Sequence, residues 1–96
     1  MKSAIIRLPL DDEIPFFCWD RKWTVAEIRR RLKESQGRER DRLMAWILRE
    51  ASYDEVWQYV TPREIDEALP RIESQLGRWR GMWRHLIKAW HELGKL

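Results

Sequence analysis

Apolar side chains recur at intervals of three and four residues along most of this chain, a spacing that places them on one face of an α-helix. The clearest stripe covers about residues 79–93 and is followed by Gly94, a residue suited to ending a helix. A second stripe covers about residues 39–51. The pattern therefore predicts a helix over each stretch, with Trp46 lying off the apolar face of the earlier one.

Capping residues indicate where another helix begins. Thr24 followed by Glu27 is a capping box, in which each side chain satisfies a free backbone N–H group of the first turn. The helix that it opens is expected to end at Gly37, because glycine tolerates the left-handed conformation of a helix end. A short helix is expected over residues 54–60, where apolar residues again recur at helical spacing.

A second capping box opens the next helix. Thr61 supplies the cap, Pro62 occupies the first helical position, and Glu64 closes the box. Pro70 is expected to break or kink this helix, because proline removes a backbone hydrogen bond and collides with the preceding turn. A separate helical piece is then expected over residues 71–76.

The start of the chain lacks any helical period. Pro9 and Pro15 exclude a continuous helix there, and residues 14–20 are densely apolar yet too few for a core helix. Such a segment must be covered by the domain itself or by a partner. The sequence thus predicts one all-α domain, in which residues 1–20 are an irregular arm and residues 24–93 form a compact bundle of about five short helices.

Seven tryptophans in 96 residues are the most unusual feature of the composition. Each can bury roughly 150–250 Å², so together they dominate the core or a contact surface. Trp83 and Trp90 follow the last helical stripe and are expected in the core. The four remaining tryptophans before it divide between core and interface in a way that the sequence leaves open: Trp19, Trp23, Trp46 and Trp57.

Charge is unevenly distributed along the chain, although the formal net charge is only +3. Residues 20–42 and 70–96 are basic, whereas residues 50–69 are acidic. A polar surface matched to a partner would have such a pattern, and so would ordinary solvated helix faces. Neither a signal peptide nor a membrane-spanning run is recognisable, because the apolar stretch at residues 4–6 is short and broken by Arg7. We therefore expect a cytoplasmic protein.

Catalytic and metal-binding residue types are scarce. The only histidines, His85 and His91, are six residues apart and so face different sides of a helix, and the only cysteine is Cys18. We therefore expect no metal site and no cofactor. Cys18 lies between Phe17 and Trp19 and is expected to be an inert buried thiol.

One short motif supports an alternative function. Arg80 is followed after four residues by His85, a spacing that resembles the catalytic motif of the dimeric helical ribonucleases called HEPN domains. In that interpretation His85 acts as the base and Arg80 stabilises the phosphate charge. A second alternative is a small RNA-binding module, in which aromatic and arginine side chains stack on single-stranded RNA.

Several motifs together resemble one protein family. Their order and spacing are similar to those of small bacterial proteins encoded beside nucleotidyltransferases of the abortive-infection toxin type. The likeness covers about residues 14–87. It rests on an ordered set of short segments: residues 14–20, 24–29, 48–51, 56–57, 60–65, 76–78 and 82–83.

The resemblance implies a non-catalytic protein that binds and neutralises a nucleotidyltransferase, as an antitoxin does in a toxin–antitoxin pair. Basic helices would complement the acidic, metal-holding cleft of such an enzyme. The apolar segment around Phe16 would supply an anchor. The residues expected to contact the partner are Phe16, Phe17, Trp19, Trp23, Arg29, Arg30, Arg78, Arg80 and Arg84.

Overall fold

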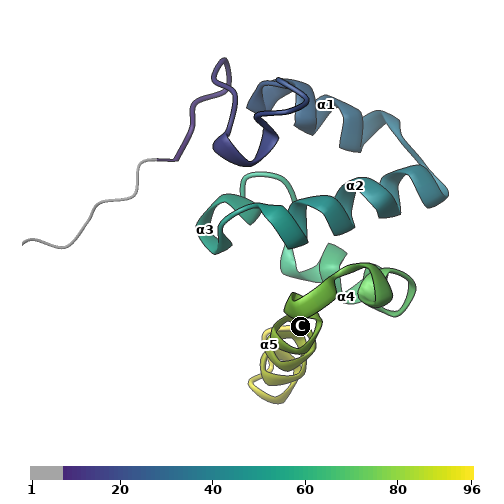
Figure 1. Ribbon diagram of the computed structural model, residues 1–96. Helices are drawn as coiled ribbons and strands as arrows, with labels where there is room; N and C mark the ends of the chain where they lie inside the picture. The colour runs from purple at the N-terminus through teal and green to yellow at the C-terminus, as the bar shows by residue number, and fades with distance from the viewer. Residues whose placement is uncertain (1–7) are drawn as a thin grey trace, which may run out of the picture.

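The computed structural model describes residues 8–96, which form five α-helices joined by short turns (Figure 1). No strand occurs in this described range, so the predicted all-α class and the five helices are confirmed. Short 3-10 turns precede α1 and join α4 to α5. The elements in chain order are η1 (Phe16–Cys18), α1 (Val25–Glu34), α2 (Gly37–Glu50), α3 (Tyr53–Val56), α4 (Pro62–Ile72), η2 (Glu73–Gln75), η3 (Gly77–Trp79) and α5 (Arg80–Glu92).

Helix α2 forms the centre of the molecule. It lies between α1 and the arm on one side and α4 and α5 on the other (Figure 1). Five consecutive residues, 44–48, are therefore buried, including Ala45 and Trp46, which lie outside the predicted stripe. A helix covered on two sides buries more than one face, and a single stripe cannot reveal that.

Trp83 is the largest fully buried side chain and joins α5 to α2. It is 1% exposed, and its indole Nε1 donates a hydrogen bond to the Leu48 carbonyl oxygen at 3.2 Å. The Trp57 ring packs edge-on against it at 5.9 Å between centroids. The predicted core position of Trp83 is confirmed, whereas Trp90 is only half-buried, 5.8 Å from Trp57.

The two predicted capping boxes have different outcomes. At α4, Thr61 Oγ1 accepts from the Glu64 N–H and Glu64 Oε1 accepts from the Thr61 N–H, at 3.2 and 2.8 Å, so this box is confirmed. At α1, Thr24 Oγ1 accepts from the Glu27 N–H at 3.1 Å. The Glu27 carboxylate binds Arg30 and Arg31 instead of the cap, so half of the prediction was wrong.

Pro70 does not break α4, so the predicted break is wrong. The helix continues through it to Ile72, and the predicted separate piece over residues 71–76 consists of the end of α4 followed by η2. Pro70 lies in the last turn, so the lost hydrogen bond to the Asp66 carbonyl and the crowding of that turn by the ring affect only the end of the helix, which stops two residues later.

Two other predicted boundaries also shift. The helix expected over residues 54–60 is the short α3, and a turn over residues 57–59 replaces its second half. Gly37, expected to end the first helix, instead opens α2 with a φ of 58°. The first helix ends at Glu34, because the chain becomes extended at Ser35. The last helix and its end at Gly94, with a φ of 73°, agree with the prediction.

The irregular arm is confirmed over the part that the structure describes. The predicted arm covers residues 1–20, of which residues 1–7 lie outside the described residues. Beyond them the arm has only turns and η1. Its backbone carbonyls at Glu13 and Asp11 accept from the N–H groups of Val25 and Ala26, at 2.9 and 3.0 Å. These N–H groups have no partner inside α1, so the arm completes the first turn of that helix.

Candidate protein-binding surface

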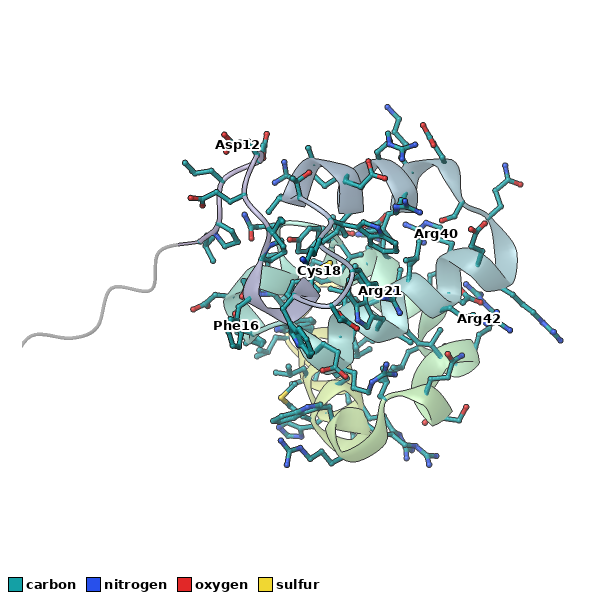
Figure 2. The ribbon with its side chains drawn as sticks, turned by 45° about the horizontal axis from the view of Figure 1, so that its top comes forward. Asp12, Phe16, Cys18, Arg21, Arg40 and Arg42 are labelled. Atoms are coloured by element: carbon teal, nitrogen blue, oxygen red, sulfur yellow. The ribbon has the colours of Figure 1, made fainter. Side chains whose placement is uncertain are left out.

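The most exposed aromatic side chains lie in the arm. Phe16 is 89% exposed and Trp19 is 70% exposed, although both stand beside the buried Cys18. Figure 2 shows Phe16 pointing away from the body of the protein, whereas Cys18 lies inside it. Two large apolar side chains, three positions apart in the chain, are thus left in solvent.

Neighbouring aromatic residues hold this part of the arm in place. The Phe17 ring packs 5.1 Å from Trp46 of α2 and 6.0 Å from Tyr59. Trp23 meets the same Trp46 ring edge-on at 5.8 Å. We call residues 16–23 the aromatic turn. Two half-buried rings, Phe17 and Trp23, pack this turn against α2, whereas Phe16 and Trp19 point into solvent.

The backbone of the aromatic turn is also fixed. The Arg21 and Lys22 N–H groups both donate to the Cys18 carbonyl oxygen, at 3.1 and 2.8 Å. Lys22 has a φ of 58°, a left-handed conformation that a side chain with a Cβ adopts only when the surrounding structure imposes it. Burial raises the pKa of the Cys18 thiol, which keeps it in the unreactive protonated form and agrees with its interpretation as inert.

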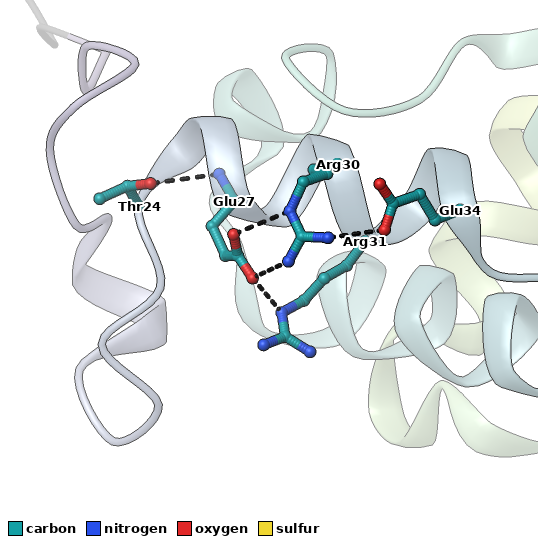
Figure 3. Close-up of polar contacts among 5 residues, drawn as sticks. All are labelled: Thr24, Glu27, Arg30, Arg31 and Glu34. Atoms are coloured by element: carbon teal, nitrogen blue, oxygen red, sulfur yellow. Dashed lines mark hydrogen bonds and ion pairs between the residues drawn. The ribbon is translucent and has the colours of Figure 1, made fainter.

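The predicted contact residues of α1 are engaged within the protein. Arg29 donates to the Gln58 carbonyl oxygen from Nε and to Asp11 Oδ1 from Nη1, both at 2.8 Å. Arg30 lies between Glu27 and Glu34, and its Nη1 is 2.6 Å from Glu34 Oε1 (Figure 3). These guanidinium groups are exposed, but Arg29 already makes two hydrogen bonds to oxygen atoms of the protein and Arg30 makes three.

Glu27 is the hub of these ion pairs and gives a pH-dependent prediction. The hydrogen bond from Arg30 holds the pKa of the Glu27 carboxyl below its usual value. A carboxyl whose folded pKa is depressed stabilises the fold above its unfolded pKa of about 4.3 and loses this effect as the pH falls through the folded pKa. We therefore expect Glu27→Gln to be less stable than the parent at pH 7, with the difference shrinking at acidic pH.

Urea denaturation at neutral and acidic pH measures this difference. Asp12→Asn is the matched control, because Asp12 is exposed and makes no ion pair with any residue of the range 8–96. An Asp12→Asn variant with the same pH-dependent loss would contradict a specific contribution from the Glu27 ion pairs.

The three predicted contact arginines near α5 also have internal partners. The guanidinium carbon of Arg78 lies 5.0 Å from the centroid of the Trp79 ring. Arg80 and Arg84 both approach Glu73 Oε1 through Nε, at 3.1 and 3.6 Å. Since α5 and α1 lie on opposite sides of α2 (Figure 1), the predicted contact residues form two groups rather than one continuous surface.

The residues of the alternative ribonuclease motif lie on the exposed side of α5. His85 lines a shallow groove between α4 and α5, whereas Arg80 is held by Glu73. The groove also contains Arg84 and Lys88. Its charge is mixed, because Asp66 and Glu73 line it too.

An arginine–tryptophan cluster was missed by the sequence reasoning. The guanidinium carbon of Arg31 lies 3.9 Å from the centroid of the Trp23 ring. The guanidinium carbon of Arg21 lies 4.4 Å from the Trp46 ring and 5.1 Å from the Trp23 ring. Such contacts are cation–π interactions, which fix the position of each guanidinium. The position of Trp46 off the apolar stripe was the one available signal.

Three further observations bear on function. Within residues 8–96, no group of three or more histidine, cysteine, aspartate or glutamate side chains is placed to hold a metal ion. None of the helices in this range is both long enough and apolar enough to cross a membrane. Comparison of the chain with protein-family models, with curated proteins and with solved structures found no match.

Proposed function

We propose that this chain is a non-catalytic protein-binding module that attaches to its partner through Phe16 and Trp19. The observation that carries the proposal is the exposure of these two aromatic side chains, at 89% and 70%, on a turn whose other aromatic residues are fixed against α2. Aromatic residues are enriched at protein interfaces and among the residues that dominate binding energy.

The fixed backbone of the aromatic turn supports the same proposal. Binding is weakened by the conformational entropy lost when a flexible segment becomes ordered. The hydrogen bonds to the Cys18 carbonyl and the packing of Phe17 and Trp23 on Trp46 order this turn before a partner arrives. Exposed aromatic groups on an ordered turn therefore lose little entropy on binding.

The proposed partner is a nucleotidyltransferase, which the chain would bind and neutralise in the cytoplasm as an antitoxin. This identity is supported by the family resemblance over residues 14–87. The arginine-rich surfaces beside the aromatic turn suit the acidic cleft of such an enzyme. No catalytic role for this chain is part of the proposal.

Co-purification tests the proposal. The gene beside that of the chain is identified first, and a nucleotidyltransferase found there is expressed together with the chain, with the affinity tag on the enzyme. We expect the two to purify as a complex. In a titration, Phe16→Ala with Trp19→Ala should weaken the affinity at least about 30-fold, because truncating two central aromatic contacts costs about 2 kcal/mol or more.

Leu93→Ser is the matched control, because Leu93 is 69% exposed and lies at the end of α5, away from the aromatic turn. This variant should bind with unchanged affinity. Failure to co-purify would overturn the proposed partner. A complex that tolerates the double substitution would overturn the role of the aromatic turn, and RNA cleavage lost in His85→Ala would favour the ribonuclease alternative.

A further inference from the structure

Within residues 8–96, eight of the thirteen arginines form an ion pair with a carboxylate, and five do not: Arg21, Arg38, Arg42, Arg63 and Arg78. Arg21 and Arg42 have no ion pair with any residue of the range 8–96. The Arg42 side chain is exposed on α2 and also makes no hydrogen bond or ring contact with residues 8–96. Arg21 is held by the Trp23 and Trp46 rings. A guanidinium without a carboxylate partner retains its full capacity to bind an anion.

These two arginines lie in one groove. The groove has a volume of about 500 Å³ and is formed by the aromatic turn, the second half of α1 and the first half of α2. Figure 2 shows Arg21 and Arg42, one from the turn and one from α2. Four arginines line the groove, against two glutamates, so its charge is positive. The lining charged residues are Arg21, Arg30, Arg31, Arg42, Glu34 and Glu39.

The groove is better suited to the carboxylates of a peptide than to a nucleic acid. Single-stranded nucleic acid binds where aromatic rings are open for base stacking. Here Arg31 already lies over the Trp23 ring, and the Trp46 ring packs against it.

The position of the groove also favours a protein. It adjoins the aromatic turn, which holds the exposed Phe16 and Trp19 on the same short segment as Arg21. Protein interfaces commonly combine central aromatic contacts with a polar rim. An apolar contact and a basic groove on neighbouring residues would therefore be used by one partner.

We propose that the groove between the aromatic turn, α1 and α2 binds an acidic segment of the partner protein, with Arg21 and Arg42 each pairing with a carboxylate. This inference rests on the proposed protein-binding function and specifies the chemistry of the partner segment. Arg21 is oriented in advance by the two tryptophan rings. Arg42 supplies a second cation on the wall formed by α2.

A capped hexaglutamate peptide is the probe that tests the groove. Binding is followed at low ionic strength by the NMR signals of the Trp23 indole N–H and the Arg21 Nε–H, and the affinity is obtained from the titration. We expect these two signals to shift, and we expect Arg42→Gln to weaken the affinity about fivefold, the upper range for one exposed ion pair. Added salt should weaken binding further.

Arg63→Gln is the matched control. Arg63 is exposed on α4, lines none of the grooves described above, and its loss changes the net charge by the same amount. The affinity for hexaglutamate should be unchanged in this variant. Equal losses in Arg42→Gln and Arg63→Gln, or no binding at all, would overturn the proposal. A thymidine hexanucleotide that binds the groove more tightly than hexaglutamate would overturn it in favour of nucleic acid.

Failure of the groove proposal and failure of the proposed partner give different combinations of results. Hexaglutamate binding that depends on Arg42, together with no co-purification of the nucleotidyltransferase, would remove that partner and retain the groove. Co-purification that depends on Phe16 and Trp19, without hexaglutamate binding, would retain the partner and remove the groove.

Discussion

Replacing Trp83 by alanine should lower the free energy of unfolding by about 3–5 kcal/mol, the range for removing a large aromatic group from a packed core. A domain of this size has a total stability of about 5–15 kcal/mol, so the substitution should remove a large fraction of it. Two losses combine. The cavity affects contacts with Trp57 and Tyr53, and the Leu48 carbonyl oxygen loses its indole donor.

Trp83 does more than fill space in the core, because its indole N–H binds the Leu48 carbonyl oxygen. Leu48 lies in the last turn of α2, where carbonyl groups have no partner within the helix. The Trp83 indole satisfies one of them, so α5 closes the end of α2. Trp83→Phe keeps most of the apolar contact and removes this bond. It should therefore cost less than the alanine variant, about 1–3 kcal/mol.

Urea denaturation followed by circular dichroism at 222 nm measures both variants. Trp79→Ala serves as the control, because Trp79 is 37% exposed and lies just before the same helix. An unfolding midpoint of Trp83→Ala equal to that of Trp79→Ala would contradict the central position of Trp83.

Replacing Trp46 by alanine should have the second largest effect, with a global part and a local part. The ring is 7% exposed and contacts Phe17, Trp23 and Arg21, so it attaches the aromatic turn to α2. We expect a loss of about 3–5 kcal/mol in global stability. Backbone amides of residues 18–23 should also exchange with deuterium faster than those of α5, because the turn loses its main attachment.

Hydrogen–deuterium exchange measured by mass spectrometry separates the two effects. Trp46→Phe keeps an aromatic ring against Phe17 and should leave the turn protected. Uniform loss of protection across α1, α2 and α5 in Trp46→Ala would show that the turn is not a distinct unit.

The parts of the fold that the sequence predicted are those governed by local rules. The Thr61 and Glu64 cap depends on residues three positions apart, and the last helix depends on a regular stripe that ends at Gly94. Both were predicted correctly. The five helices and the all-α class follow from the same rules, because each helix has its own stripe or cap.

The parts that could not be predicted depend on contacts between distant residues. Ala45 and Trp46 are buried because the arm and α1 cover a second face of α2, and no period in α2 itself records this. The Glu27 carboxylate pairs with Arg30 and Arg31 and therefore does not bind the Thr24 N–H, as the capping box requires. Helix α4 continues through Pro70 and ends two residues later, at Ile72.

The candidate surface was predicted only in part, for the same reason. Phe16 and Trp19 could be named from their position in an apolar segment too short for a helix, and they are exposed. Which arginines are free could not be known, since Arg29 is bound to Gln58 and Asp11, at 29 and 18 positions along the chain. Arg21 and Arg42 could be named as anion-binding residues only from the structure, which shows that they line one groove and form no ion pair with residues 8–96.

The fastening of the arm to α1 has a consequence for how this surface can change over generations. The bonds run from the Val25 and Ala26 N–H groups to the main-chain carbonyls of Glu13 and Asp11. Every amino acid offers the same carbonyl, so mutation of those side chains leaves these two bonds in place. The exposed side chains at positions 16 and 19 take no part in these hydrogen bonds. A lineage could therefore alter its choice of partner there while its scaffold stays the same.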